Sequence, residues 1–130
     1  MQIDLETRED LIHLLRTTEY KFVIFKFTAT WCKPCAKIKS FVNDMVEEKI
    51  NQLNATQKQN HFLFVEVDID ECFDIYSFLK KKKVINGVPS LFAYNTEISR
   101  KTDESYMYLP HGNVSGTNEG DIRRLFDMIQ

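Results

Sequence analysis

Apolar residues recur at helical spacing in four segments of the chain, and each segment predicts an amphipathic helix. The first follows Thr7 as its N-cap, and the second begins near Pro34, which suits a first helical turn. The third follows a cap at Asp70 and ends in the lysine run 80–83, and the fourth follows a polar cap at 117–118. The expected buried stripes are Leu11, Ile12, Leu14 and Leu15; Ile38, Phe41, Val42, Met45 and Val46; Ile75, Phe78 and Leu79; and Ile122, Leu125, Phe126 and Ile129.

Four other segments carry the β-branched and aromatic residues that are typical of strands. The run 22–27 is almost continuously apolar, which predicts a central parallel strand covered on both faces, and 61–68 predicts a second buried strand. A turn at 86–87 precedes a third strand over 88–94. Residues 105–109 predict a fourth strand, which would pair with the third as a hairpin.

The order of these elements predicts an α/β domain with a mixed sheet. A chain of 130 residues, of which 43% are hydrophobic, is long enough for one such domain. We therefore expect residues 1–130 to form a single domain. The polar stretch 51–60 is expected to be a frayed helix end and an exposed loop.

Charge and cysteine content narrow the classes of function. The 17 basic and 19 acidic residues give a formal net charge of −2, which provides no electrostatic drive toward nucleic acid or anionic lipid. Three cysteines outside any dense pattern indicate a reducing compartment. Residues 1–9 contain Asp4, Glu6 and Glu9 and no apolar core, so we expect no signal peptide, and no apolar stretch approaches the ~20 residues of a membrane span. These features predict a cytoplasmic protein.

The segment 31–35, Trp-Cys-Lys-Pro-Cys, lies between a predicted strand and a predicted helix, and C-x-x-C in that context is typical of thiol-disulfide exchange. The two intervening residues bend the chain into a helical turn, so the sulfurs can reach bonding distance while that of Cys32 stays exposed and that of Cys35 is partly covered. The unpaired N–H groups of the helix start would stabilise a thiolate on Cys32. The positive charge of Lys33 would also stabilise this thiolate.

Other interpretations of the cysteines stay open at this point. Cys32 and Cys35 could be an inactive relic or half of a zinc site, for which Cys72, His61 and His111 would have to supply the missing ligands. None of these three forms a second close pair in the sequence, so metal binding has no positive support. Cys72 itself is either a packed small hydrophobe or a regulatory thiol.

Four segments together resemble the thioredoxin family, and the resemblance covers nearly the whole chain. They are Phe-Thr-Ala-Thr-Trp-Cys-Lys-Pro-Cys at 27–35, the acid-rich strand end 64–70, the Gly-Val-Pro-Ser loop 87–90 and the loop 114–121. Lys33 and Ser115 each replace a glycine that the family usually has. The resemblance implies the thioredoxin fold, a central mixed sheet with helices on both faces.

The same resemblance implies roles for individual residues. Cys32 would be the nucleophile and Cys35 the resolving thiol of a redox-active disulfide. The surface that holds the substrate would consist of Trp31, Lys33, Pro34, Val88 and a cis Pro89. It also implies a monomer that reduces disulfide-containing proteins in cell redox homeostasis. The protein would bind no cofactor of its own, and its electrons would come from NADPH through a thioredoxin reductase.

The clearest departure from the family is Lys26, which occupies the position of a buried aspartate beneath the active site. Strand alternation allows Lys26 to lie beside Glu66, which would give a charge-reversed pair. A protonated Lys26 would stabilise the dithiol and make the couple more oxidising, and Glu66 would be the base for Cys35. The alternatives are therefore an oxidase or isomerase, or a binding module that uses the same groove without turnover.

Overall fold

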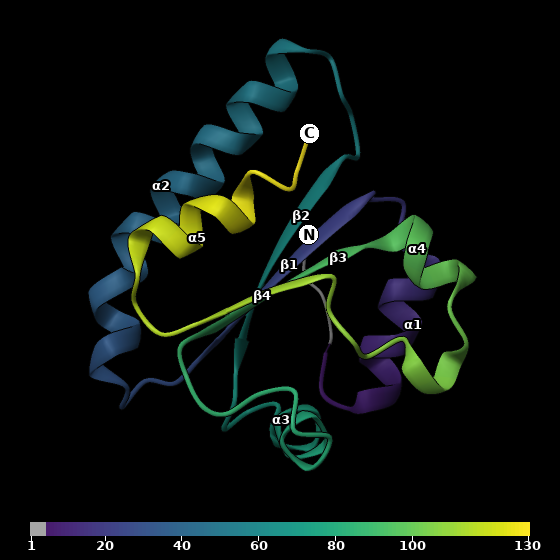
Figure 1. The fold of residues 1–130 in the computed structure, drawn as a ribbon, viewed down its shortest axis with the longest axis vertical. Coiled ribbons are helices and arrows are strands. Elements are labelled where there is room, and N and C mark those ends of the chain that lie inside the picture. Colours follow the sequence, from purple (N-terminus) through teal and green to yellow (C-terminus); the bar gives the residue numbers. More distant parts are fainter. Residues whose placement is uncertain (1–4) are drawn as a thin grey trace.

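The computed structural model describes residues 5–130. Residues Met1–Asp4 lie outside the described residues. They include Asp4, on which the expectation of no signal peptide partly rests. The elements are α1 (Arg8–Thr17), β1 (Phe22–Thr28), α2 (Lys33–Ala55), β2 (Phe62–Asp68), α3 (Phe73–Lys81), β3 (Ser90–Asn95), α4 (Thr96–Lys101), a 3₁₀ turn η1 (Glu104–Tyr106), β4 (Gly112–Ser115) and α5 (Glu119–Phe126), as Figure 1 shows.

The strands form one mixed sheet in the order β2-β1-β3-β4. β1 pairs in parallel with β2 and antiparallel with β3, and β3 pairs antiparallel with β4. β1 therefore lies inside the sheet, and its residues from Phe22 to Phe27 are all buried, which confirms the predicted central strand. Its C-terminal end leads through residues 29–31 to the start of α2 (Figure 1), so the cysteines at that helix start lie beyond the end of a central strand.

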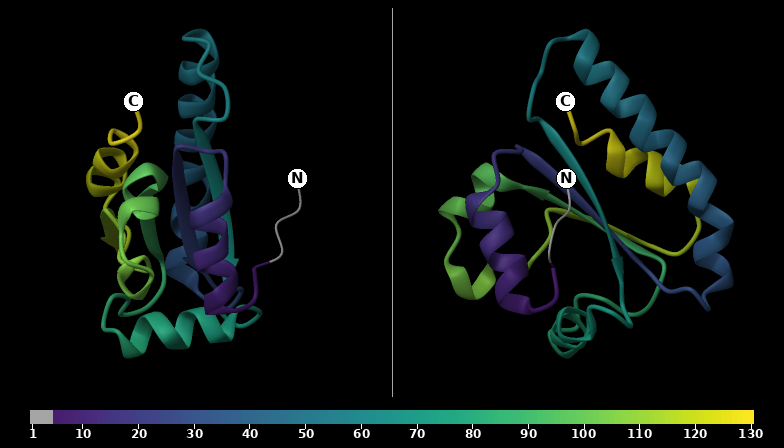
Figure 2. Two further views of the ribbon diagram at one scale, coloured as in Figure 1. Left: turned by 90° about the vertical axis from the view of Figure 1, so that its right-hand side faces the viewer. Right: turned by 180° about the vertical axis from the view of Figure 1, so that it is seen from behind.

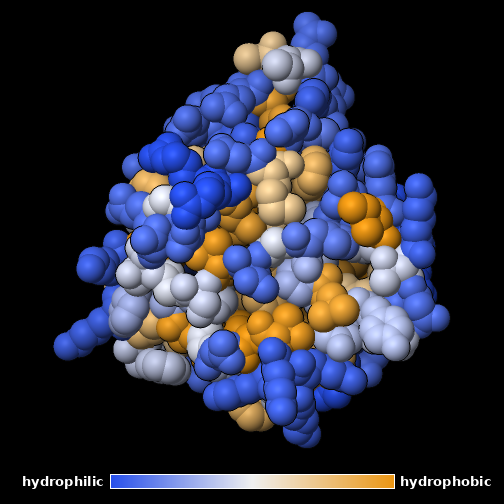
Figure 3. Space-filling view, in the orientation of Figure 1, coloured by the Kyte–Doolittle hydropathy of each residue, from blue (hydrophilic) through white to orange (hydrophobic). Residues whose placement is uncertain are grey.

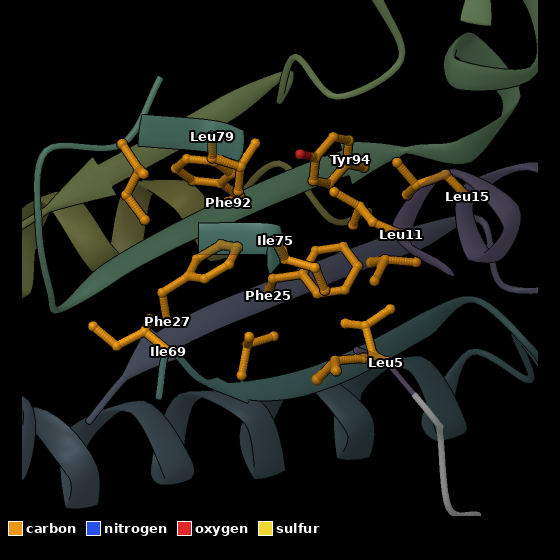
Figure 4. Close-up of a cluster of buried hydrophobic side chains, with 14 of the residues drawn as sticks. Leu5, Leu11, Leu15, Phe25, Phe27, Ile69, Ile75, Leu79, Phe92 and Tyr94 are labelled. Carbon is orange, nitrogen blue, oxygen red and sulfur yellow. The ribbon is translucent and has the colours of Figure 1, made fainter. Parts of the chain in front are cut away.

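Helices cover both faces of the sheet, as predicted. On one face, Phe25 and Phe27 of β1 pack with Phe92 and Tyr94 of β3, and the aromatic rings lie together under α1 and α3 (Figure 4). On the other face, Ile24 belongs to a second apolar cluster with side chains of α2 and α5. These two helices run alongside one another in Figures 1 and 2.

Three of the four predicted helix starts are confirmed, two of them by their caps and one by a proline in the first turn. The Thr7 side chain accepts from the Asp10 backbone N–H, the Asn118 side chain accepts from that of Asp121, and Pro34 lies in the first turn of α2. Such caps satisfy N–H groups that have no partner inside the helix. α2 extends to Ala55 before an exposed loop begins, in agreement with the prediction for 51–60.

The predicted cap at Asp70 is wrong. α3 begins at Phe73 after Cys72, whose side chain makes no capping hydrogen bond. The Asp70 carboxylate is already used, because it accepts the indole N–H of Trp31 at 2.8 Å. The prediction of a helix ending in the lysine run is confirmed, since α3 ends at Lys81.

The predicted fourth strand over 105–109 is also wrong. That segment includes the last two residues of the η1 turn and the chain after it, and the strand that pairs with β3 is β4, at 112–115. A helix, α4, fills part of the polar connection after β3. The Asn95 side chain accepts the N–H groups of Glu97 and Ile98, and this local cap starts the helix immediately after β3.

Hydrophilic residues predominate on the face drawn in Figure 3, and apolar residues reach the surface mainly in its middle part. Within residues 5–130, no helix combines the length and the apolar character that a bilayer crossing needs.

Candidate active site at the start of helix α2

Cys32 and Cys35 form a disulfide across the first turn of α2, with their Cα atoms 5.3 Å apart. Cys32 is the N-cap residue of the helix, and its Sγ atom accepts the backbone N–H of Cys35 at 3.1 Å. The sulfur of Cys32 thus lies where the helix presents unpaired N–H groups and the positive end of its dipole. The sequence-based prediction that the two sulfurs reach bonding distance is confirmed.

The prediction that the first sulfur stays exposed is wrong for this disulfide form. Cys32 is 5% exposed and Cys35 is 2% exposed, so both residues are buried. The physical reason is that the Cys32 sulfur is bonded to Cys35 and also lies 3.8 Å from the Val88 carbonyl oxygen. Cys32 is nevertheless the more accessible of the two, in the predicted order.

The loop before β3 lies against the disulfide. The peptide bond between Val88 and Pro89 is cis, as expected, and the Val88 carbonyl faces Cys32. The Pro89 carbonyl accepts the backbone N–H of Gly116 at 3.0 Å, so the loop after β4 lies beside the cis-proline loop. Ser115 adjoins it as the register partner of Ser90, and Gly116 has a φ of +100°, a conformation that favours glycine.

Trp31 is 64% exposed, which confirms the predicted exposed ring beside Cys32. Its indole N–H donates to Asp70, and this hydrogen bond holds the ring against the turn that follows β2. Lys33 and Pro34 are exposed as well. Trp31, Lys33 and Pro34 therefore form an exposed aromatic and cationic surface next to the disulfide.

Lys26 lies in the middle of the sheet and is only 1% exposed. It is the register partner of Glu66 on β2, so the predicted adjacency of the two residues is confirmed. In the described part of the chain, however, no carboxylate oxygen lies within 4.0 Å of the Lys26 amine. Burial lowers the pKa of Lys26, Glu66 raises it and nearby Lys39 lowers it further.

A cleft of about 520 Å³ connects this lysine to the cysteines. Lys26, Lys39 and Glu66 line it together with Cys32 and Cys35. Lys39 follows Cys35 by one helical turn on α2, which places both side chains on the same face of the helix. The cleft therefore brings two amines and a carboxylate close to the disulfide.

The third cysteine lies outside the reacting pair. The half-buried Cys72 thiol donates to the Leu5 carbonyl oxygen at 2.9 Å, and burial, together with nearby acidic side chains, raises its pKa. A raised pKa keeps the thiol protonated and less nucleophilic. The histidines considered for a zinc site lie elsewhere, since His61 contacts the Gln130 carbonyl oxygen and His111 accepts the Asn95 N–H.

Sequence reasoning missed one residue that lines the cleft and one exposed residue at the start of α3. Lys39 was not considered, although its spacing of four residues from Cys35 was a usable signal. Phe73 was not considered either, and it is 67% exposed at the first position of α3. Its signal was its place outside the apolar stripe formed by Ile75 and Leu79.

The chain is similar in sequence to known thioredoxins. Residues 6–107 match the thioredoxin family. Thioredoxin of Oryctolagus cuniculus is 35% identical over 71 residues, which cover 55% of this chain and 58% of that protein. Thioredoxin 3 of Plasmodium falciparum is 30% identical over 125 residues, which cover 95% of this chain and 57% of that protein. The matches thus span less than two thirds of the length of these curated relatives.

The fold is similar to that of solved thioredoxins. A Plasmodium falciparum thioredoxin superposes with a TM-score of 0.64 at 18% identity, covering 97% of each chain. Schistosoma mansoni thioredoxin superposes with a TM-score of 0.59 at 26% identity, covering 96% of this chain and 89% of the other. These structures share the mixed sheet with helices on both faces.

Proposed function

The chain belongs to the thioredoxin family, and on that premise we propose that it is a protein-disulfide oxidoreductase. The observation that carries the proposal is the Cys32–Cys35 disulfide at the start of α2, next to the cis-proline loop. A cysteine at a helix N-terminus has the environment that favours a thiolate, and the thiolate is the form that attacks disulfides. Lys33 adds a positive charge beside it.

The reaction would proceed in two exchanges. In the first, the Cys32 thiolate attacks one sulfur of a substrate disulfide; the substrate S–S bond breaks, a mixed disulfide forms, and the departing thiolate takes up a proton. In the second, Cys35 loses its proton and attacks Cys32 Sγ, which releases the other substrate thiolate and closes the Cys32–Cys35 disulfide. Two electrons pass from the cysteine pair to the substrate, which becomes a dithiol.

The residues around the disulfide have separate tasks in this proposal. Trp31, Val88 and Pro89 would hold the extended substrate backbone, and Lys33 and Pro34 would border it on the side of α2. Glu66, across the sheet from Lys26, would accept the Cys35 proton through the cleft that both residues line.

The setting of the reaction is part of the proposal. We expect disulfide-containing proteins as substrates and electrons from NADPH through a thioredoxin reductase, without a cofactor bound to this chain. We also expect a monomer that acts in the cytoplasm, in cell redox homeostasis. The family membership supports these expectations.

Insulin reduction by dithiothreitol tests the activity. We predict that Cys32→Ser abolishes catalysis and that Cys35→Ser nearly does so, because each exchange needs its own sulfur. Cys72→Ser is the matched control and should retain activity, since its protonated thiol does not take part. An active Cys32→Ser variant, or an inactive Cys72→Ser variant that is folded by circular dichroism, would contradict the proposal.

A second candidate function is oxidation or isomerisation of protein disulfides, favoured by the buried Lys26 amine on the cleft below the cysteines. A positive charge there would stabilise the thiolates and raise the reduction potential. Equilibration with glutathione decides between the two functions. A potential near the roughly −270 mV of thioredoxin indicates a reductant, and one near the roughly −180 mV of protein disulfide isomerase indicates an oxidant or isomerase.

A further inference from the structure

Two strongly exposed aromatic side chains flank the turn between β2 and α3. Trp31 is 64% exposed and Phe73 is 67% exposed, and they are the two most exposed large hydrophobic residues in the described part of the chain. Asp70 and Glu71, both exposed, lie between them along the turn. We call these four residues, Trp31, Asp70, Glu71 and Phe73, the Trp31–Phe73 patch.

The patch is continuous with the active site. The Ile69 N–H donates to the Thr28 carbonyl at 2.9 Å, which ties the turn to the end of β1 just before the cysteine segment. Asp70 then accepts the Trp31 indole N–H, and Glu71 lines the same cleft as Cys32. Phe73, the first residue of α3, follows Glu71 by two residues, so the patch borders the cleft that Cys32 lines.

Phe73 has no packing role that explains an aromatic residue at this position. The apolar face of α3 buries Ile75 and Leu79 completely, whereas Phe73 is largely exposed and belongs to neither apolar cluster of the core. An exposed aromatic ring beside a reactive centre offers apolar area that a bound partner can cover. Aromatic residues are among those enriched where proteins bind one another.

The charge of the patch is negative. The Asp68 carboxylate accepts the backbone N–H groups of Asp70 and Glu71, and Asp70 accepts from Trp31, but none of these donors is a cation. Among the described residues, none of the ion pairs involves Asp68, Asp70 or Glu71. Arg8 is paired with Asp74 at 2.8 Å, and Lys39, which lines the same cleft as Glu71, forms no ion pair within the described residues. The patch therefore complements a partner that carries positive charge.

We propose that the Trp31–Phe73 patch selects disulfide-bearing polypeptides that carry an apolar side chain and a lysine or arginine close to the attacked cysteine. The apolar side chain would cover the Phe73 ring beside Trp31, and the basic side chain would face Glu71. This inference rests on the proposed disulfide-exchange function and specifies the substrate class of the same site. Phe73 is a specificity-determining residue in this account and takes no part in the exchange itself.

Two synthetic peptides, each with one intramolecular disulfide, test the selection. One carries Phe and Lys beside the attacked cysteine, and the other carries Ser and Glu at the same positions. We expect Phe73→Ser to lower kcat/KM for the Phe-Lys peptide about tenfold, through KM, and to leave the Ser-Glu peptide within about twofold. Glu71→Gln should weaken the preference for the Phe-Lys peptide less than Phe73→Ser does. This loss should be larger at low salt than at high salt, because salt screens the charge interaction.

Tyr106→Ser is the matched control, because Tyr106 is also an exposed aromatic residue, at 58%, but lies in η1. Tyr106→Ser should leave kcat/KM for both peptides unchanged. Equal losses for both peptides in Phe73→Ser, or the same loss in Tyr106→Ser, would overturn the proposal. Reduction of the small disulfide dithiobis(nitrobenzoate) distinguishes failure of the exchange function from failure of the patch proposal. If the unmodified protein does not reduce this compound, the exchange function is wrong. If it reduces the compound but shows no preference between the peptides, only the patch proposal is wrong.

Discussion

Lys26 is the residue that most distinguishes this chain from the family pattern. Its side chain is buried on the cleft below the cysteines, and burial disfavours the charged form and lowers its pKa. Strand alternation allowed Lys26 to lie beside Glu66 but did not fix the strand register, and the pairing of β1 with β2 supplies it. The absence of a close carboxylate in the described structure was beyond sequence reasoning, since it depends on side-chain conformation in the cleft.

Replacing this lysine should move the potential of the cysteine pair. We predict that Lys26→Met makes the reduction potential more negative by roughly 30 mV, equivalent to about 1.4 kcal/mol, because the lost positive charge no longer stabilises the thiolates. The shift should shrink as pH rises, because the amine of the unmodified protein then loses its proton. Glutathione equilibration at two pH values measures it. Lys39→Met, an exposed lysine on the same cleft, is the control and should shift the potential less. A less negative potential in Lys26→Met would refute this role.

At the scale of the elements, an ion pair joins the first helix to the third. Arg8 at the start of α1 donates to Asp74 in α3 through its backbone N–H and its guanidinium, and these bonds lower the pKa of Asp74 to about 2. A carboxyl group whose pKa is lowered on folding stabilises the native state above its unfolded pKa of about 3.9. That contribution is lost as pH falls toward 2. The pair is partly exposed, so the effect is modest.

Urea unfolding at several pH values checks this link between α1 and α3. Asp74→Asn should be less stable than the unmodified protein at pH 7, and the difference should vanish as pH approaches 2. Asp44→Asn, an exposed carboxylate on α2, should show a smaller difference at pH 7. A difference for Asp74→Asn that persists unchanged at low pH would show that the loss comes from packing instead.

Element prediction succeeded where apolar periodicity and burial agree, as in β1 and α2, and it failed in the connection between β3 and β4. There the segment 105–109 has strand-like composition, yet Asp103 accepts the Ser105 N–H and starts a 3₁₀ turn. Asn95 likewise starts α4. These short-range caps compete with strand pairing and leave no periodic signal in the sequence.

At the scale of the whole molecule, the site is assembled at one end of strands β1, β2 and β3 from segments far apart in the chain. The cysteine motif follows β1, the acidic turn follows β2 and the cis-proline loop precedes β3. The sequence was sufficient to identify Cys32, Cys35 and Pro89 because each belongs to a recognisable motif. Phe73 was missed because the only local signal was its place outside the stripe of Ile75 and Leu79, whereas its exposure of 67% follows from the packing of α3.

The most direct test of the account is to trap the mixed disulfide. A reduced Cys35→Ser variant that is incubated with a disulfide-containing protein should form a stable covalent adduct, because the exchange stops after the attack by Cys32. Peptide mapping by mass spectrometry should locate the bond on Cys32, and adding Cys32→Ser should abolish it. An adduct through Cys72, or no adduct with a protein that the unmodified chain reduces, would contradict the proposed exchange.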